Sequence, residues 1–354
     1  MLVDAYGRPL NGLRIIVTPE CNLSCFFCHL EGDPHGSPLT PGFFRNHMTP
    51  EEYDIVAEAA SSVGIDYFKV TGGEPLIRRD IVEIVGRLSG YGFVSMTTNG
   101  VLLDTYAEPL YEAGLRKVNV SVHHLDPKAY KMITGRSLIG RVLRGIEAAL
   151  DTGMEVKVNV VLLKGINESH VWSIIGFAEK MGLDVQIIEL IPVGRGRKAR
   201  ESMYASSEAI EKRLAELGAR RVVRRLHNRP IYVMPSGIRV ELVRPVDNPY
   251  FCMGCERVRL TSRGELIPCI NWKGPGVDVL KRIRSSKTRR EALERVVEAL
   301  VEVNYIRRPY ALYGPELDAP MKRPKASRIS HPKKRSLREV AQSLYYSRLA
   351  PFNG

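Results

Sequence analysis

Six cysteines form two sets of three in this chain of 354 residues. The first set has the spacing C-x3-C-x2-C and comprises Cys21, Cys25 and Cys28. The second set has C-x2-C, then thirteen residues before its last member, and comprises Cys252, Cys255 and Cys269. Three thiolates can hold three irons of a [4Fe–4S] cluster and leave the fourth iron open to another ligand. The cysteines therefore predict two iron–sulfur clusters, each with one open iron.

Zinc is the alternative at both sets. At the first set, His29 would be the fourth ligand, although two adjacent ligands strain a tetrahedral site. At the second set, no histidine lies between residues 228 and 330, so a zinc ribbon would need a ligand from elsewhere in the chain. Packing of buried thiols without any metal is the third interpretation. Clusters remain the leading interpretation because each set stops at three cysteines.

Charged residues and glycines lie next to both sets. Arg257 and Arg259 follow Cys255, and alternate residues of an extended strand share one face. Two guanidinium groups on one face suit a polyphosphate or a purine, whereas a solvated charged strand is the plain alternative. Gly73 would let a ligand approach the backbone closely, and Glu74 can accept a hydrogen bond from an ammonium group. The alternative interpretation of Gly73 and Glu74 is a simple turn without a ligand, because such a turn could have the same residues.

The elements that position these residues alternate between strands and helices. Strands are predicted over residues 13–18, 67–71, 93–98, 117–122, 156–162 and 185–190. Helices are predicted over residues 53–63, 79–88, 106–113, 140–152 and 168–181. This α/β alternation predicts a parallel sheet in a partial (β/α)6 TIM-like barrel, whose chemistry lies at the carboxyl ends of its strands. The residues that follow or end the first four strands are Cys21, Gly73, Thr97 and Ser121.

The pattern changes after residue 195. We expect a barrel core over 1–195, a C-terminal region over 196–306 that carries the second cluster and closes the barrel, and a basic arm and tail over 307–354. Within the C-terminal region, residues 195–200 are predicted as a basic loop, 207–217 as a helix and 230–243 as a hairpin. Residues 307–338 hold ten Lys or Arg, two acids and five prolines, a composition typical of an extended solvated arm. A short helix is predicted over 336–346.

The formal net charge of +13 favours a polyanionic partner. No uninterrupted apolar run reaches the roughly 18 residues that a membrane helix needs, and no secretory signal is predicted. We therefore expect a cytoplasmic protein with reduced cysteines and no membrane partner. A zinc-stabilised nucleic-acid-binding protein is one hypothesis that the charge supports, although no aromatic RNA-binding motif is present. A single nucleotide is the better candidate for the polyanion.

Several of these segments together resemble the radical S-adenosylmethionine superfamily and, within it, the GTP 3′,8-cyclase family of molybdenum cofactor biosynthesis. The resemblance runs from about residue 8 to residue 275. The segments that carry it are residues 13–18, 70–80, 97–100, 114–121, 156–161, 164–167 and 252–269. The first cysteine set alone would indicate only the superfamily, whereas both sets with Arg257 and Arg259 indicate the narrower family.

The resemblance implies a lyase that converts GTP to (8S)-3′,8-cyclo-7,8-dihydro-GTP with S-adenosylmethionine and two [4Fe–4S] clusters. The first cluster would bind S-adenosylmethionine and cleave it to a 5′-deoxyadenosyl radical, and the second would bind the guanine. S-adenosylmethionine would be held by Phe27, Gly73, Glu74, Ser121 and Ile191. GTP would be held by Arg14, Lys69, Thr97, Lys157, Arg257 and Arg259. The residues implied as catalytic are Arg14, Arg257 and Arg259.

The same resemblance implies three partners: an electron donor, the next enzyme of the pathway and a second copy of the chain in a homodimer. The alternative enzyme is a radical enzyme with an auxiliary cluster that modifies a peptide or another cofactor. The sequence departs from the family pattern at Glu20, His123 and Gln186, the last standing where an arginine is often found, and it ends in Asn353-Gly354 rather than two glycines. Alternation along the strands would point Arg14 and Lys157 into the barrel, and an unpaired inward Lys157 predicts an anionic ligand.

Overall fold

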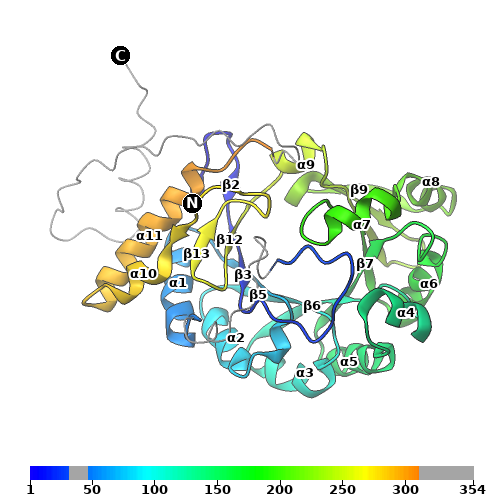
Figure 1. The fold of residues 1–354 in the computed structure, drawn as a ribbon, viewed down its shortest axis with the longest axis horizontal. Coiled ribbons are helices and arrows are strands. Elements are labelled where there is room, and N and C mark those ends of the chain that lie inside the picture. Colours follow the sequence, from blue (N-terminus) through cyan, green and yellow to red (C-terminus); the bar gives the residue numbers. More distant parts are fainter. Residues whose placement is uncertain (32–46, 311–354) are drawn as a thin grey trace, which may run out of the picture.

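A strongly curved sheet with helices around its outside forms the molecule (Figure 1). The computed structural model describes residues 1–31 and 47–310. Within these residues the main sheet has twelve strands in the order β14-β13-β12-β3-β4-β5-β6-β7-β8-β11-β10-β9. Its two end strands do not pair with each other, so the predicted partial barrel is confirmed.

Six parallel strands make the centre of this sheet. They are β3 (Gly12–Ile16), β4 (Tyr67–Thr71), β5 (Phe93–Thr98), β6 (Leu115–Ser121), β7 (Glu155–Leu162) and β8 (Asp184–Glu189). Each of the six predicted strands is present, with ends displaced by two residues at most. The strands were recognisable because β-branched and aromatic side chains suit a buried pleated surface.

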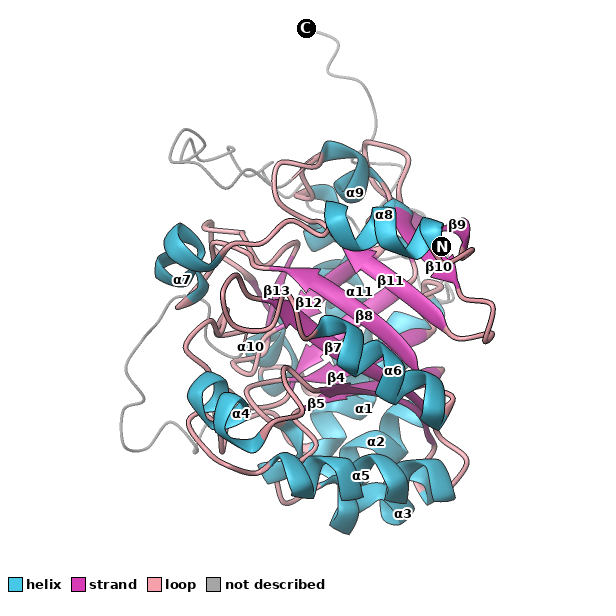
Figure 2. Cartoon of the chain, turned by 90° about the vertical axis from the view of Figure 1, so that its right-hand side faces the viewer, coloured by secondary structure: helices cyan, strands magenta, loops and turns pink. Residues whose placement is uncertain are grey.

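Helices cover the outer face of the sheet and connect these strands (Figure 2). The predicted ones are α1 (Pro50–Ser62), α2 (Ile81–Ser89), α3 (Leu103–Glu112), α5 (Ile139–Asp151) and α6 (Val171–Met181). Helix α1 begins with a capping box, because the Thr49 hydroxyl accepts from the Glu52 N–H at 3.3 Å and the Glu52 carboxylate accepts from the Thr49 N–H at 2.8 Å. The additional helix α4 (Pro127–Thr134) was not predicted, although Asp126 caps it.

The C-terminal region extends the sheet at both edges. On one side β12 (Arg257–Leu260) lies parallel to β3 and continues into β13 (Glu265–Ile267) and β14 (Val277–Asp278). On the other side β11 (Arg239–Val243) lies parallel to β8, followed by β10 (Arg229–Val233) and β9 (Arg220–Arg224). The predicted hairpin is therefore confirmed as β10 and β11, but its addition to β8 was not predicted.

Two predictions for the C-terminal region are wrong. Residues 195–200 are not a loop, because helix α7 (Gly196–Met203) contains most of them. Arg307 is not the start of a solvated arm: it is 3% exposed and lies 3.3 Å from the Asp4 carboxylate. The predicted helix at 207–217 is confirmed as α8 (Glu208–Glu216). Most of the predicted arm, the helix at 336–346 and the Asn353-Gly354 end lie outside the described residues.

Short elements complete the described fold. The N-terminal strands β1 (Leu2–Val3) and β2 (Pro9–Leu10) form a separate ribbon, and single 3₁₀ turns are η2 (Pro75–Ile77) and η3 (Leu226–Asn228). The remaining helices are α9 (Pro249–Met253), α10 (Val279–Arg284) and α11 (Arg289–Tyr305). Helix α11 packs against α1, β13 and β14. No helix in the described ranges is both long enough and apolar enough to cross a membrane.

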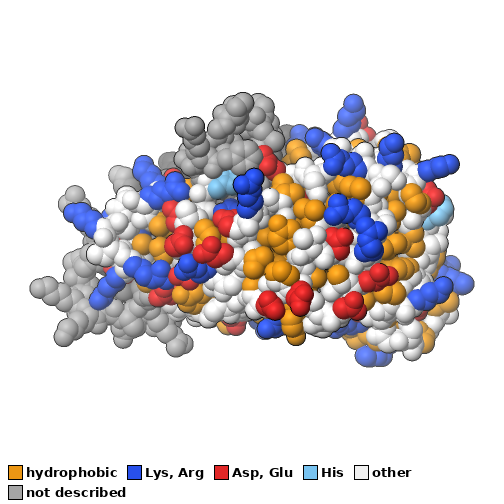
Figure 3. Space-filling model, turned by 90° about the horizontal axis from the view of Figure 1, so that it is seen from below, with side chains coloured by type: hydrophobic (Ala, Val, Ile, Leu, Met, Phe, Trp, Pro, Cys, Tyr) orange, Lys and Arg blue, Asp and Glu red, His pale blue; other side chains and the backbone are white. Residues whose placement is uncertain are grey.

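The two faces of the parallel strands differ in chemistry. Residues that face the helices are fully buried and apolar, as at Leu13, Ile15, Phe68, Val70 and Val158. The residues between them point to the inner face and are polar or charged, because successive side chains of a strand alternate between faces. The outer surface at the bottom of Figure 1 mixes acidic, basic and apolar side chains (Figure 3). The inner face of the barrel therefore carries polar and charged side chains, among them Arg14, Lys69 and Lys157.

Candidate active site

Strand register places the inward polar residues side by side. Arg14 on β3 pairs with Arg259 on β12 on one side and with Lys69 on β4 on the other. Further round the sheet, Asn119 on β6 pairs with Lys157 on β7. Parallel strands in this register bring residues far apart in the sequence to the same height in the barrel. The result is a belt of cations across the inner face, which consists of Arg259, Arg14, Lys69 and Lys157.

These side chains line a cavity of about 370 Å³. Both cysteine sets and every implied S-adenosylmethionine or GTP residue except Glu74 are among its lining residues. The implied residues at the wall are Arg14, Phe27, Lys69, Gly73, Thr97, Ser121, Lys157, Ile191, Arg257 and Arg259. The volume and the mixture of apolar and polar groups are those of a small-molecule site. Residues as far apart in the sequence as Arg14 and Cys269 thus line the same cavity.

The loop that carries the first cysteine set is fixed to the loop after β4. The Gly73 N–H donates to the Thr18 carbonyl at 2.8 Å, and the Glu74 N–H donates to the Glu20 carbonyl at 2.6 Å. A Cβ on Gly73 would lie 2.0 Å from the Glu20 carbonyl oxygen, a distance that no real contact allows. Glycine is therefore required here by the neighbouring backbone itself, in addition to any approach by a ligand.

Glu74 is 1% exposed, and its carboxylate already has three donors. It accepts from the Leu76 N–H at 3.0 Å, the Thr98 hydroxyl at 2.7 Å and the Asn99 N–H at 2.6 Å. Burial raises the pKa of Glu74 to about 7. In this arrangement the side chain joins the loops after β4 and β5. Its contact with a ligand ammonium stays a prediction.

The six cysteines all lie in the described residues, and none of them forms a disulfide bond. Burial raises the pKa of Cys21 to about 11 and that of Cys25 to about 12, and it also raises the pKa of Cys28 and Cys269. Thiols buried in this way become thiolates when a metal compensates the charge, so binding a cluster would release protons. The three thiols of each set line one cavity, and thiolates are the ligands of iron–sulfur clusters, so the donor chemistry fits two clusters.

The zinc alternative at the first set needed His29. Its Nε2 instead lies 3.3 Å from a carboxylate oxygen of Glu31.

Both chain ends of the described structure support the loop of the second cysteine set. Arg8, which is 5% exposed, donates to the Cys252 carbonyl at 2.9 Å and to the Arg308 carbonyl at 2.6 Å. The Arg307 guanidinium donates to the Cys255 carbonyl. Arginines can satisfy several carbonyls at once because the guanidinium has five N–H groups. The sequence prediction missed this role of Arg8 and Arg307.

Arg257 and Arg259 point into the cavity from β12, as their alternation predicted. The Arg257 guanidinium lies 5.3 Å from the centre of the Tyr67 ring, and burial lowers its pKa to about 9. The Arg259 guanidinium pairs instead with the Glu31 carboxylate. The two arginines therefore share a face of the strand but differ in their partners.

Glu31, which the sequence prediction missed, is the counterion of two implied substrate residues. Its side chain is 4% exposed, and one oxygen lies 2.5 Å from Arg14 Nε. Burial alone would raise the pKa of Glu31, but the guanidiniums of Arg14 and Arg259 hold it well below its usual range. An acid three residues after a cysteine motif has no distinctive signal, and only the fold brings it to these arginines.

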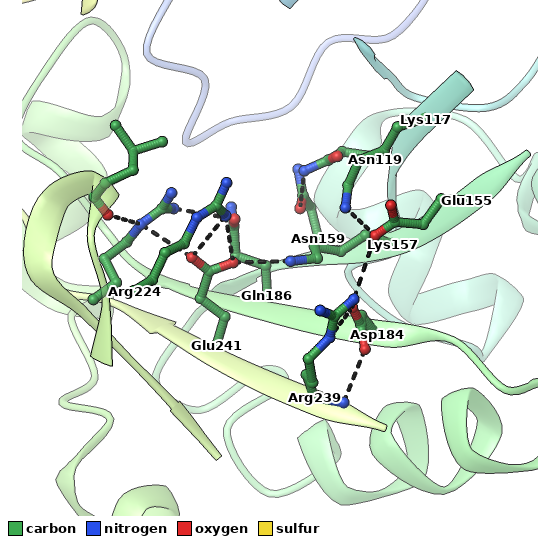
Figure 4. Close-up of polar contacts among 12 residues, drawn as sticks. Lys117, Asn119, Glu155, Lys157, Asn159, Asp184, Gln186, Arg224, Arg239 and Glu241 are labelled. Carbon is green, nitrogen blue, oxygen red and sulfur yellow. Dashed lines mark hydrogen bonds and ion pairs between the residues drawn. The ribbon is translucent and has the colours of Figure 1, made fainter. Parts of the chain in front are cut away.

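Lys157 also has a counterion that the sequence did not reveal. Its Nζ lies 2.9 Å from the carboxylate of Glu241 on β11, which is 0% exposed (Figure 4). The expectation of an unpaired Lys157 is therefore wrong, because β11 joins the sheet beside β8 and supplies an acid. Arg224 and Arg229 share this carboxylate and were likewise missed. Gln186 and His123, where the sequence departs from the family pattern, also line the cavity.

Two family models match consecutive parts of the chain. The radical SAM superfamily matches residues 15–178, and the family described as Molybdenum Cofactor Synthesis C matches residues 183–307. A probable GTP 3′,8-cyclase from Aeropyrum pernix is 51% identical over 324 residues, which are 90% of this chain and 91% of that protein. The chain belongs to the GTP 3′,8-cyclase family.

Other members of the GTP 3′,8-cyclase family agree with this assignment. The probable GTP 3′,8-cyclase from Pyrococcus horikoshii is 39% identical over 320 residues, 88% of this chain and 98% of that protein. Among solved structures, Streptococcus suis SuiB bound to S-adenosylmethionine has a TM-score of 0.58 at 14% identity, covering 77% of this chain and 64% of SuiB. That similarity concerns the fold alone. Membership in a radical SAM family implies a [4Fe–4S] cluster and S-adenosylmethionine as cofactors.

Proposed function

We propose that this chain converts GTP to (8S)-3′,8-cyclo-7,8-dihydro-GTP, the first step of molybdenum cofactor biosynthesis. One observation carries the proposal: both cysteine sets line the same cavity, and a belt of cations lies with them. Family membership at 51% identity supports the same reaction.

The first set, with Cys21, Cys25 and Cys28, would hold the cluster that binds S-adenosylmethionine. When bound, that cluster supplies the electron that cleaves S-adenosylmethionine and starts the radical reaction. The protein positions the cofactor through the Gly73 loop, the end of β6 at Ser121 and the apolar side chains of Phe27 and Ile191. These residues also exclude water from the reacting atoms.

The second set, with Cys252, Cys255 and Cys269, would hold a second cluster at the guanine end of the substrate. Arg257 would then contact the nucleotide directly, because no acid among the described residues pairs with it. Lys69 is likewise buried, at 6% exposure, without an acidic partner in the described structure. Burying such cations is costly unless an anion joins them, and the substrate's phosphates would supply it. Arg14, Thr97 and Arg259 would complete the nucleotide site.

The domain division proposed here is a barrel core over 1–195 and a C-terminal region over 196–306 that completes the cavity wall. Strands β11 and β12 of that region flank the six central strands and bring Glu241, Arg257 and Arg259 to the cavity. The electron donor and the next enzyme of the pathway would be its partners, with GTP as the substrate.

Anaerobic reconstitution followed by incubation with GTP, S-adenosylmethionine and a reductant tests this function. We expect about eight irons per chain, two [4Fe–4S] clusters, and a cyclised product with the mass of GTP. A Cys269→Ala variant should retain about four irons and still cleave S-adenosylmethionine, but make no cyclised product. If the intact enzyme cleaves S-adenosylmethionine but does not consume GTP, GTP is refuted as the substrate, while the assignment to the radical enzymes is retained.

A further inference from the structure

One wall of the cavity gathers three cations around a single carboxylate. Glu241 on β11 has its oxygens 2.9 Å from Lys157 Nζ, 3.1 Å from Arg229 Nε and 3.2 Å from Arg224 Nη1. Figure 4 shows the Glu241 carboxylate between the side chains of Lys157 and Arg224. We call these four residues the Glu241 cluster. They come from four different strands, β7, β9, β10 and β11.

The Glu241 cluster carries a surplus of positive charge. Three cations share one carboxylate, which leaves two positive charges without a partner inside the cluster. The neighbouring Gln186, on β8, accepts from Arg229 Nη1 at 3.2 Å but is neutral. Burial lowers the pKa of Arg229 to about 10 and also lowers the pKa of Lys157. A buried surplus of this kind is costly by itself and is relieved by an anionic ligand.

The donors of these arginines are only partly used. Arg229 directs Nε to Glu241 and to the Leu226 carbonyl, and Nη1 to Gln186, so its Nη2 has no hydrogen-bond partner among the residues described. Arg224 uses Nη1 for Glu241, while its Nε and Nη2 have none in that same part of the chain. Both arginines line the cavity with Lys157. Planar guanidinium groups held in this way match the oxygens of a phosphate.

The cations that pair with Glu31 are compensated more fully. Arg14 and Arg259 share Glu31, so one carboxylate serves two guanidiniums. In the Glu241 cluster one carboxylate serves three cations, and Arg257 and Lys69 of the same cavity have no acid at all in the described structure. A polyanion entering the cavity is therefore drawn more strongly to the Glu241 cluster, Arg257 and Lys69 than to the two arginines that share Glu31.

We propose that Arg224 and Arg229 bind the polyphosphate of the nucleotide together with Lys157. The assignment rests on the proposed function, in which GTP is the substrate. It adds two residues from the β9–β10 extension to the substrate site, and Glu241 holds their guanidiniums at the cavity wall. The neutral Gln186 leaves β8 without a cation, and Arg229 supplies one at that position from the neighbouring extension.

The test measures how affinity depends on the number of phosphates. Anaerobically reconstituted holoenzyme and its Arg224→Gln and Arg229→Gln variants would be titrated with GTP, GMP and guanosine. We expect each variant to bind GTP about tenfold more weakly, to bind GMP with a smaller loss and to bind guanosine within about twofold of the wild type. The matched control is Arg221→Gln, also on β9, whose side chain is 58% exposed and which should leave all three affinities unchanged.

Different failures have different meanings. Unchanged GTP affinity in both variants would overturn the inference about Arg224 and Arg229, while the proposed function would stand. An equal loss of affinity for GTP and guanosine would also overturn the inference, because it would show that the arginines have only a structural role. If the wild-type holoenzyme neither binds nor converts GTP, the proposed function itself fails. If the Arg229→Gln variant does not take up its iron, the inference is tested with two other variants, Arg229→Lys and the more exposed Arg224→Gln. The Arg229→Lys variant should keep most of the GTP affinity.

Discussion

Two buried carboxylates hold the cations of the cavity, and they do so from different kinds of structure. Glu31 lies in the loop three residues after Cys28, and its side chain is 4% exposed. Glu241 lies inside strand β11, and its side chain is 0% exposed. Glu31 pairs with Arg14 and Arg259, whereas Glu241 pairs with Lys157, Arg224 and Arg229.

The difference in backbone support gives the two carboxylates different tasks. Strand β11 is hydrogen-bonded to β8 on one side and to β10 on the other, so Glu241 cannot shift without disturbing the sheet. Glu31 belongs to no strand or helix, and a loop residue can move at much smaller cost. We infer that Glu241 is a permanent part of the cavity wall, whereas Glu31 is a counterion that an entering phosphate can replace.

The largest expected effect is on stability at Glu241. A Glu241→Ala variant leaves the buried Lys157 and Arg229 and the half-buried Arg224 without their acid, so we expect the free energy of unfolding to fall by about 3–5 kcal/mol. Chemical denaturation of the metal-free protein, followed by circular dichroism, measures the change. Glu31→Ala, tested beside it, should cost less because its loop can adjust. A loss below about 1 kcal/mol at Glu241 would remove the distinction between the two carboxylates.

The sharpest expected effect is an opposite change in GTP binding. Glu31→Gln removes a carboxylate that competes with phosphate for Arg14, so GTP should bind several-fold more tightly. Glu241→Gln removes the counterion of Lys157, whose pKa burial already lowers, so this lysine should lose its charge more readily and GTP should bind more weakly. That weakening should be greater at pH 9 than at pH 7. Equilibrium titration with GTP measures both, and changes of the same sign would contradict the comparison.

A smaller effect is expected in the pH dependence of stability. Burial opposes ionisation of Glu241, but Arg229 and Lys157 lower its pKa from the usual 4.5 to about 2. Because the folded pKa is the lower one, its stabilisation is complete above pH 4.5 and is lost as the pH falls toward 2. Urea unfolding of the metal-free protein between pH 7 and pH 3 should show this loss, with a shallower slope for Glu241→Gln. Equal slopes would mean that Glu241 does not titrate in this window.

The smallest effect is expected at an exposed cation at the start of the same strand, which is not among the residues that line the cavity. Arg239 on β11 lies 2.6 Å from Asp184 and 3.5 Å from Glu155, and its side chain is 52% exposed. Exposed ion pairs contribute little, so Arg239→Gln should change the free energy of unfolding by less than about 1 kcal/mol. It should leave GTP binding unchanged. A large loss would show that any charge on β11 matters, rather than the buried cluster.

The six central strands and the helices between them were predictable from local sequence. β-Branched runs mark strands such as β4 and β7, and the Thr49-Pro50 signal marks the start of α1. Helix α7 was not recognised, because half of its eight residues are charged and only Gly196 and Ala199 are buried. A helix with so narrow an apolar face has little hydrophobic periodicity to read.

The sequence by itself determined the two cysteine sets, the inward alternation of Arg14, Arg257 and Arg259, and membership in a radical enzyme family. These depend on spacing along single segments, where period and residue type carry the information. Only the tertiary structure decided which acids meet which cations. Glu31 is seventeen residues from Arg14 and Glu241 is eighty-four residues from Lys157, and nothing local links them. Their pairing follows from the addition of β12 to β3 and of β11 to β8, because strand pairing between distant segments depends on packing of the whole sheet rather than on any one segment.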